Sequence, residues 1–289
     1  MATINTNVAA QISANALAKN DREMTKAMER LATGSRINSA SDDAAGLAVA
    51  SKLTSRIRGI DQAVRNGNDA ISLISTADGA MIEVSNMLQR MRELSVQGGN
   101  GTLSSTDLTA LNTEFVALRT EIERIADNTQ WNGANLLDGS AGANGLMTFQ
   151  VGYEADQTIT VNLGDLQLEG DASYSAGATA GGVFGNDISS LTITTATLAN
   201  TSLTAIDVSI AGLDAKRSVL GSTLNTLEFA VDNLANASQN ASAARSRIAD
   251  ADYAKETTEL ARTQIIAQAS TAMLSQANQQ ALSVMALLK

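Results

Sequence analysis

Apolar residues recur at alternating steps of three and four along much of the chain, and this spacing restricts the possible folds more than any other feature. Between residues 107 and 127 the apolar stripe consists of Leu108, Leu111, Phe115, Leu118, Ile122 and Ile125. Steps of three and four place side chains on one face of an α-helix. The pattern therefore predicts an amphipathic helix over 107–127.

Two longer stripes have the same spacing. Residues 43–97 carry one that is interrupted at Gly67 and Asp78, and residues 206–234 carry another with a single polar member, Arg217. At ~1.5 Å per residue, a helix over the first segment would be roughly 80 Å long. Long helices with one apolar face each can bury those faces against one another, so we expect the three to pack as a bundle.

Both ends of the chain carry heptad stripes that contain many small residues. Near the N-terminus the stripe is formed by Ile4, Val8, Ile12, Leu17, Met24 and Leu31. Near the C-terminus it is formed by Leu260, Ala267, Leu274, Ala277, Ala281, Val284 and Leu288. Burying a CH₂ group gains only ~0.8 kcal/mol, whereas ordering the backbone of one residue costs ~1–2 kcal/mol. We therefore expect both ends to be ordered by pairing with each other and with the ends of neighbouring copies.

The middle of the chain has a different pattern. Two β-rich runs within 146–163 flank a turn and predict a β-hairpin, and 190–198 is a further candidate strand. Ten acidic residues and no basic one lie between Arg124 and Lys216, so this segment accounts for the whole net charge of −10 and is expected at a solvated surface. The predicted class is mainly α: a long helical coiled coil and bundle built from both chain termini, with a small central part that contains the hairpin.

The chain contains no cysteine, histidine or proline. Without Cys and His it cannot build a zinc cluster, a thiol nucleophile or a Ser-His-Asp triad. The acidic segment lacks the spacing of a calcium loop, and pairs such as Asp42 and Asp43 are too close in sequence to converge on a reacting group. We expect no enzyme, no cofactor and no metal, and we expect the two aspartates to cap the helix that follows them.

Charge and hydropathy also restrict the partners. A net charge of −10 disfavours nucleic acid as a partner. The sequence contains no run of 18 apolar residues, so we expect no membrane insertion. The C-terminal stripe has too few cations for a helix that lies on a membrane surface. No Sec-type signal opens the sequence. The lack of proline and cysteine suits a chain that crosses a membrane unfolded and refolds beyond it, because slow prolyl isomerisation and wrong disulfides are both avoided.

Several blocks of the sequence resemble the bacterial flagellin family, whose members form the flagellar filament. They are INTNVAAQ (4–11), ERLATGSRINSASDDAAGLAVA (29–50), LQRMRELSVQ (88–97), TQWNGANLLDG (129–139) and SRIADADYAKETTELARTQIIAQASTAMLSQANQQ (246–280). The matching ends cover about 1–165 and 200–289. Such long blocks at both termini are specific to the family.

The resemblance implies a division into domains. Residues 1–42 would be the N-terminal D0 helix and connector, and 43–165 the N-terminal part of D1, with two long helices and the hairpin. Residues 166–199 would be a short variable outer region, 200–242 the C-terminal D1 helix, and 243–289 the C-terminal connector and D0 helix. The D0 helices of the family pair in the inner tube of the filament.

The resemblance also implies partners and a location. Flagellins polymerise with copies of themselves, leave the cell unfolded through the flagellar type III export channel, bind an export chaperone, and meet the filament cap and hook-associated proteins. The expected location is therefore extracellular, in the bacterial flagellum. A hook–filament junction protein is the alternative, since it shares the terminal helices of flagellin.

One block carries a further expectation. Arg90, Leu94 and Gln97 follow helical spacing, and with Gln89 they are expected to contact neighbouring subunits. In flagellins of this pattern the same surface is recognised by the vertebrate Toll-like receptor for flagellin. By resemblance, Arg90 and Leu94 with Glu114 of the next helix match that receptor's contact positions, so the released monomer is expected to be an agonist.

Overall fold

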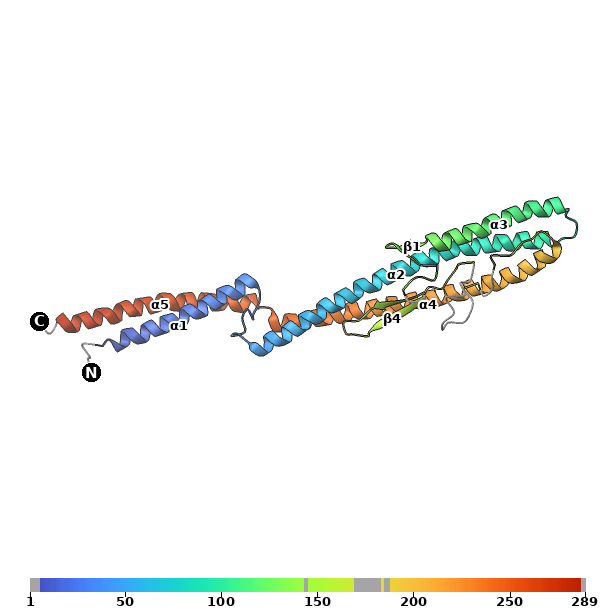
Figure 1. The fold of residues 1–289 in the computed structure, drawn as a ribbon. Helices are drawn as coiled ribbons and strands as arrows, with labels where there is room; N and C mark the ends of the chain where they lie inside the picture. Colours follow the sequence, from blue (N-terminus) through green and yellow to red (C-terminus); the bar gives the residue numbers. More distant parts are fainter. Residues whose placement is uncertain (1–5, 143–144, 169–182, 185–187, 287–289) are drawn as a thin grey trace. The chain divides into compact units, whose positions relative to one another are not determined.

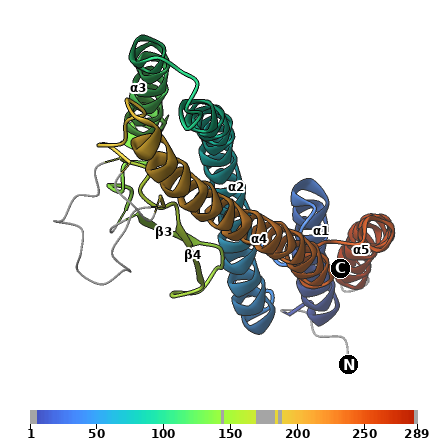
Figure 2. The same cartoon turned by 90° about the vertical axis from the view of Figure 1, so that its right-hand side faces the viewer.

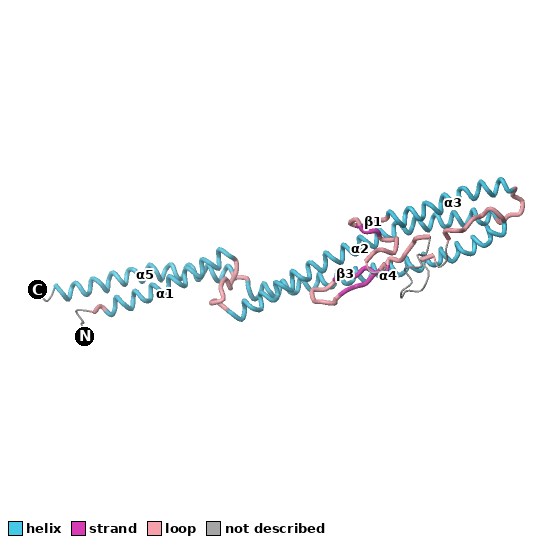
Figure 3. Tube along the Cα trace, viewed as in Figure 1, coloured by secondary structure: helices cyan, strands magenta, loops and turns pink. Residues whose placement is uncertain are grey.

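Helices dominate the structure, a computed structural model that describes residues 6–142, 145–168, 183–184 and 188–286 (Figures 1 and 3). The helices in these ranges are α1 (Val8–Thr33), α2 (Ala44–Gly98), α3 (Ser105–Asn128), α4 (Ala196–Ala249) and α5 (Tyr253–Ala286). Two antiparallel hairpins are formed by β1 (Gln130–Trp131) with β2 (Ala134–Asn135) and by β3 (Leu146–Gln150) with β4 (Thr158–Asn162). The predicted mainly α class with a small β-containing central part is confirmed.

The chain divides into two compact units. The first unit consists of Met1–Ile57 and Gln239–Lys289, and the second consists of Arg58–Ser238. The first unit contains the pair α1 and α5, and the second contains α3, both hairpins and the main apolar core. Each unit is therefore described by itself below.

The predicted helices 43–97 and 107–127 agree closely with α2 and α3. Asp43 caps α2 as expected, because its Oδ1 accepts the backbone N–H of Gly46 at 2.8 Å. Ser104 and Asp107 form a reciprocal capping box at the start of α3. Helix α4 extends beyond the predicted stripe at both ends, where its sequence is rich in Ala, Ser and Asn and gives little apolar periodicity.

The candidate strand at 190–198 was wrong. Helix α4 begins at Ala196, and Thr195 precedes it as a cap, with its Oγ1 accepting the N–H of Leu198 at 3.3 Å. The N–H of Ile193 donates to the side-chain Oδ1 of Asn112 at 2.9 Å, so a side chain satisfies this backbone group in place of a neighbouring strand. A β-branched run alone did not distinguish a buried loop from a strand.

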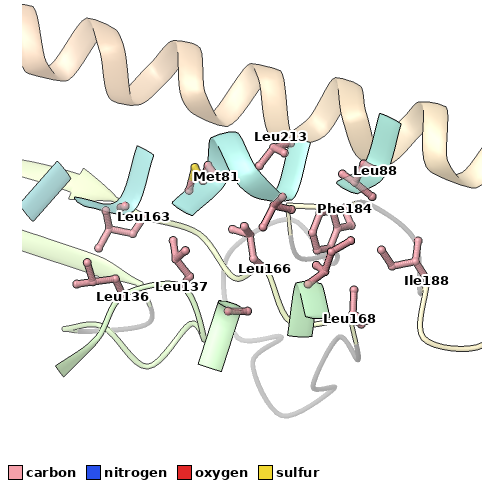
Figure 4. Close-up of a cluster of buried hydrophobic side chains, with 14 of the residues drawn as sticks. Met81, Leu88, Leu136, Leu137, Leu163, Leu166, Leu168, Phe184, Ile188 and Leu213 are labelled. Atoms are coloured by element: carbon pink, nitrogen blue, oxygen red, sulfur yellow. The ribbon is translucent and has the colours of Figure 1, made fainter. Parts of the chain in front are cut away.

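The core of the second unit lies between α2, α3, α4 and the segments that follow β2 and β4 (Figure 2). Phe115 and Ile122 of α3 are completely buried in it. Close-packed leucines from the non-helical segments surround the facing residues of α2 and α4. The members drawn in Figure 4 include Met81, Leu88, Leu136, Leu137, Leu163, Leu166, Leu168, Phe184, Ile188 and Leu213. This core fills the space between the predicted bundle helices.

The polar interruptions of the apolar stripes have partners within the second unit. Asp78 of α2 accepts a hydrogen bond from Nε of Arg217 of α4 at 2.8 Å, so the one polar member of each stripe pairs with the other. This hydrogen bond also raises the pKa of Arg217 above its ordinary value. At Gly67 a Cβ atom would lie only 2.6 Å from Cγ2 of Val231, so glycine permits the two helices to approach closely there.

The predicted hairpin over 146–163 is confirmed by β3 and β4, which pair from Leu146↔Asn162 to Gln150↔Thr158. Hydrogen bonds join the hairpin to both long helices. Asn66 Nδ2 of α2 donates to the carbonyl oxygen of Gln150 at 3.0 Å, and Lys216 Nζ of α4 donates to Oδ1 of Asn162 at 2.9 Å. Burial lowers the pKa of Lys216.

Two glycines of α2 give a matched test of helix packing. Gly79→Ala adds a methyl group where nothing lies within 4 Å, so the higher helix propensity of alanine should raise the free energy of unfolding by about 1 kcal/mol. Gly67→Ala gains the same propensity but forces Val231 aside, which costs ~1–3 kcal/mol. Urea unfolding should show that Gly67→Ala is the less stable variant by at least about 1 kcal/mol. Equal stabilisation by both substitutions would contradict the close approach.

Candidate self-assembly surface

Helices α1 and α5 lie side by side and antiparallel in the first unit (Figure 1). Asn7 Nδ2 donates to the carbonyl oxygen of Ala277 at 3.1 Å, and Asn20 Nδ2 donates to that of Thr263 at 2.7 Å. The residue numbers of the contacting residues therefore increase along α1 while they decrease along α5. The expected pairing of the two chain ends is therefore present, and it joins residues 243 positions apart at Asn20.

The contact between α1 and α5 has heptad spacing, but its large apolar residues are only partly buried. On α1 the more buried positions are Ala10, Ser13, Leu17, Asn20, Met24, Ala27 and Leu31. On α5 they are Glu256, Leu260, Thr263, Ala267, Ser270, Leu274 and Ala277. We call these residues the terminal seam. Its most buried members are Asn20, Ala27, Glu256 and Thr263, so small and polar groups are the ones that the contact covers best. Such a seam contributes little hydrophobic stabilisation.

An ion pair anchors one end of the terminal seam. Arg30 Nη1 of α1 donates to Oε1 of Glu256 at 3.2 Å, and the Glu256 side chain is only 8 % exposed. A nearly buried carboxylate needs such a partner, because removing it from water is costly. On the solvent side Arg262 pairs with Glu259 and Glu23.

The predicted assembly residues occupy two different environments. Leu17, Leu274 and Ala277 lie in the terminal seam, whereas Val8 and Ile12 point away from it and are 52 % and 64 % exposed. Asn7 takes the seam position at this end and also caps α1, with its Oδ1 accepting the N–H of Ala10 at 3.0 Å. Ile4 and Leu288 lie outside the described residues. Ala281 and Val284 belong to α5, but their side chains also lie outside the described set.

Helix α5 also carries an exposed apolar patch that the sequence analysis missed. We call it the α5 outer patch, and it consists of Ile265, Ile266, Ala269 and Met273. Ile265 is 67 % and Met273 63 % exposed. Spacings of four and eight residues place Ile265, Ala269 and Met273 along one exposed line of the helix, and Ile266 lies between this line and the terminal seam. Two adjacent isoleucines between the seam residues Thr263 and Ala267 could have predicted this patch, because adjacent residues cannot both face α1.

The connectors beside these helices are held by backbone and carboxylate hydrogen bonds. Arg36 N–H donates to the carbonyl oxygen of Ala249 at 2.7 Å, and Ala251 N–H donates to that of Gly34 at 2.9 Å. Asp42 does not cap α2 as expected: its Oδ2 accepts the N–H groups of Ser39 and Asn38, and these bonds lower the pKa of Asp42. Asp43 takes the capping role alone.

A second candidate surface lies on α2 and α3. Nε of Arg90 donates to Oε1 of Glu114 at 2.9 Å, and its Nη1 donates to Oε2 of Glu93 at 2.8 Å. These hydrogen bonds raise the pKa of Arg90, and the bond to Glu114 contributes most. Gln89 and Gln97 are exposed beside it.

The expectation for Leu94 needs a correction. Its side chain is completely buried in the core of the second unit, so it does not lie on the exposed surface of α2. Steps of four and seven residues keep Arg90, Leu94 and Gln97 within roughly 60° of the helix circumference. This face lies at the border of the core, so Leu94 is buried while Arg90 and Gln97 are exposed. Leu94 therefore supports the surface from beneath.

Comparison with known proteins agrees with these features. Residues 4–142 match the bacterial flagellin N-terminal helical region, and residues 203–288 match the bacterial flagellin C-terminal helical region. The chain is 46% identical to the flagellin of Halalkalibacterium halodurans over 286 residues, which cover 99% of each chain. The chain belongs to the bacterial flagellin family. It is therefore a structural subunit of the flagellar filament, not an enzyme.

Other relatives show the same relationship. The flagellin of Bacillus subtilis is 40% identical over 302 residues, with 99% of each chain covered. The crystal structure of Bacillus cereus flagellin has a TM-score of 0.47 and 30% identity, and it covers 59% of this chain and 88% of that one. The Halalkalibacterium halodurans and Bacillus subtilis proteins, each matched over 99% of its length, are both flagellins. Among the described residues, no helix is long and apolar enough to cross a membrane.

The ion pair in the terminal seam gives a double-substitution test. Arg30→Met alone should leave the nearly buried Glu256 carboxylate without its partner and weaken the pairing of α1 and α5. Because Arg30 is partly exposed, we expect a modest effect of roughly 1.4 kcal/mol, or about tenfold faster tryptic cleavage at Lys19. Adding Glu256→Leu should restore the original rate, because an apolar pair replaces the ionic one. Unchanged cleavage in Arg30→Met, or no recovery in the double variant, would contradict the assigned role.

Proposed function

We propose that α1 and α5 are the D0 helices through which this subunit contacts its copies in the filament, and that the helical bundle of the second unit serves as D1. One observation carries the proposal: the terminal seam buries mainly small and polar groups, while Val8, Ile12, Ile265 and Met273 remain exposed. Large apolar side chains on the outside of a weakly packed helix pair are typical of an interface with another molecule. Family membership supports copies of the chain as that molecule.

The proposed domain limits come from the resemblance to the family. The D0 part comprises 1–42 and 243–289, and the D1 part comprises 43–165 and 200–242. The short remainder, 166–199, is assigned to the outer region, and half of it lies outside the described residues. A subunit of this kind has little mass beyond D1.

Export and delivery form the second part of the proposal. The chain crosses the flagellar type III channel unfolded, is held before export by a chaperone on its C-terminal segment, and is added beneath the filament cap, with hook-associated proteins at the filament's base. The absence of Cys and Pro supports this route because refolding needs neither disulfide formation nor prolyl isomerisation. A terminal seam that is weak alone keeps the chain ends available for the chaperone and for assembly.

Recognition of the free monomer forms the third part. Arg90 and Glu114 are both exposed and pair with each other across α2 and α3, which gives a receptor a fixed charged surface flanked by Gln89 and Gln97. We assign this surface to contact with neighbouring subunits in the filament and, in the released monomer, with the Toll-like receptor for flagellin. One surface can serve only one partner at a time, so the polymer would hide it.

Charge placed on the exposed apolar residues should block assembly. Ile12→Asp or Ile265→Asp brings a carboxylate into the proposed contact, where burial without a partner is costly. Each should raise the critical concentration for growth on filament seeds by about tenfold or more. Ile265→Val, which keeps the patch apolar, is the matched control and should elongate seeds like the unchanged protein. Normal elongation by both aspartate variants would rule out these residues as the contact.

The receptor assignment has its own test. Arg90→Ala in the full-length monomer should lower the potency in a receptor reporter assay at least several-fold, because the charged surface loses its centre. Arg124→Ala removes an arginine that is also exposed and also paired, with Glu121 of α3, and should leave the potency unchanged. Undiminished signalling by Arg90→Ala would remove this part of the proposal.

A further inference from the structure

The most exposed described methionine lies in the α5 outer patch. Met273 is 63 % exposed, and it follows Ile265 by eight residues and Ala269 by four, so the three share one line along α5. The adjacent seam residue Leu274 faces α1 and is half-buried. The thioether sulfur is therefore open to solvent in the free subunit, within the surface that we assign to contact between copies.

The other described methionines have different surroundings. Met81 and Met91 are completely buried in the core of the second unit. Met24, Met87 and Met147 are partly buried, and Met28 of α1 is 45 % exposed. Oxidation of methionine depends on access to the sulfur. A dilute oxidant should therefore react with Met273 and, more slowly, Met28, while the core remains reduced.

We propose that Met273 is an oxidation site whose sulfoxide prevents the free subunit from entering the filament. The reaction takes a peroxide as oxidant: a sulfur lone pair attacks one peroxide oxygen, the O–O bond breaks, and an S–O bond forms. The sulfur is oxidised by two electrons, and hydrogen peroxide is reduced to water. This inference rests on the proposed contact function of the α5 outer patch.

The sulfoxide changes the chemistry of the patch. It converts a flexible apolar side chain into a polar one with a strong hydrogen-bond acceptor. The neighbours Ile265, Ile266 and Ala269 offer no side-chain donor, and the guanidinium of Arg262, further along the same face, is already paired with Glu259 and Glu23. A sulfoxide buried against another subunit would lose its hydrogen bonds to water. Because every subunit of a helical polymer repeats the same contact, every added subunit meets the same penalty.

The state of assembly also decides when the reaction can occur. In the free chain the Met273 sulfur is exposed, whereas a neighbouring subunit on the outer patch would cover it. Peroxide should therefore oxidise free subunits and leave finished filaments intact. Methionine sulfoxide reductases reverse the reaction, so oxidation would arrest growth until the subunit is reduced.

The test uses the full-length protein treated with dilute hydrogen peroxide, with peptide mass spectrometry to locate the sulfoxide and seeded elongation as the readout. Unchanged protein that carries the sulfoxide at Met273 should need about a tenfold higher concentration to elongate seeds. Met273→Leu, treated identically, should elongate like untreated protein. Met28→Leu is the matched control and should remain sensitive. Reductase treatment should restore growth of the oxidised unchanged protein.

Two results would overturn the inference. One is normal elongation by protein in which Met273 is fully oxidised, and the other is equal loss of growth in oxidised Met273→Leu. Untreated samples show whether the inference itself fails or the contact function on which it rests. If neither untreated protein elongates seeds, the proposed contact function fails and the inference fails with it; if both elongate, the oxidised samples decide.

Discussion

The antiparallel pairing of α1 with α5 is the interaction on which the function of this chain depends. It joins the two ends of the sequence through the hydrogen bond from Asn20 to Thr263 and the ion pair between Arg30 and Glu256. Both contacts fix the register of the helices, yet neither buries much apolar surface. Large apolar side chains such as Ile12, Ile265 and Met273 lie on the outside, where another subunit can bury them. In the proposed function, marginal stability alone and higher stability in the filament both follow from this arrangement.

The second unit shows the opposite distribution. Many of its leucines and isoleucines point inward together with Phe115 and Phe184, and Asp78 within its helix contacts is paired with Arg217. The hairpin is attached to both long helices by Asn66 and Lys216. A buried core of this kind can hold its shape before assembly. In the proposed function, this body is combined with chain ends that gain partners in the filament.

Much of this architecture was predictable because helical periodicity is a local property of the sequence. The ranges of α2 and α3 and the pairing of the ends followed from it, and β-rich runs on either side of a turn predicted the hairpin of β3 and β4. What periodicity could not give was the direction of single side chains at the border of a stripe. Leu94 is buried and Ile12 is exposed. Whether a residue at the border of a stripe is buried depends on how the neighbouring helix packs against it. The loop before α4 was misassigned for a related reason: its backbone bonds are satisfied by side chains such as Asn112, which no local pattern reveals.

The central claim is that α1 and α5 gain their stability from neighbouring subunits, and amide hydrogen exchange tests it most directly. The account predicts weak protection of α1 and α5 in dilute monomer, strong protection of the same amides in filaments, and strong protection of α2, α3 and α4 around the core in both states. Full protection of α1 and α5 in dilute monomer, unchanged on assembly, would contradict it.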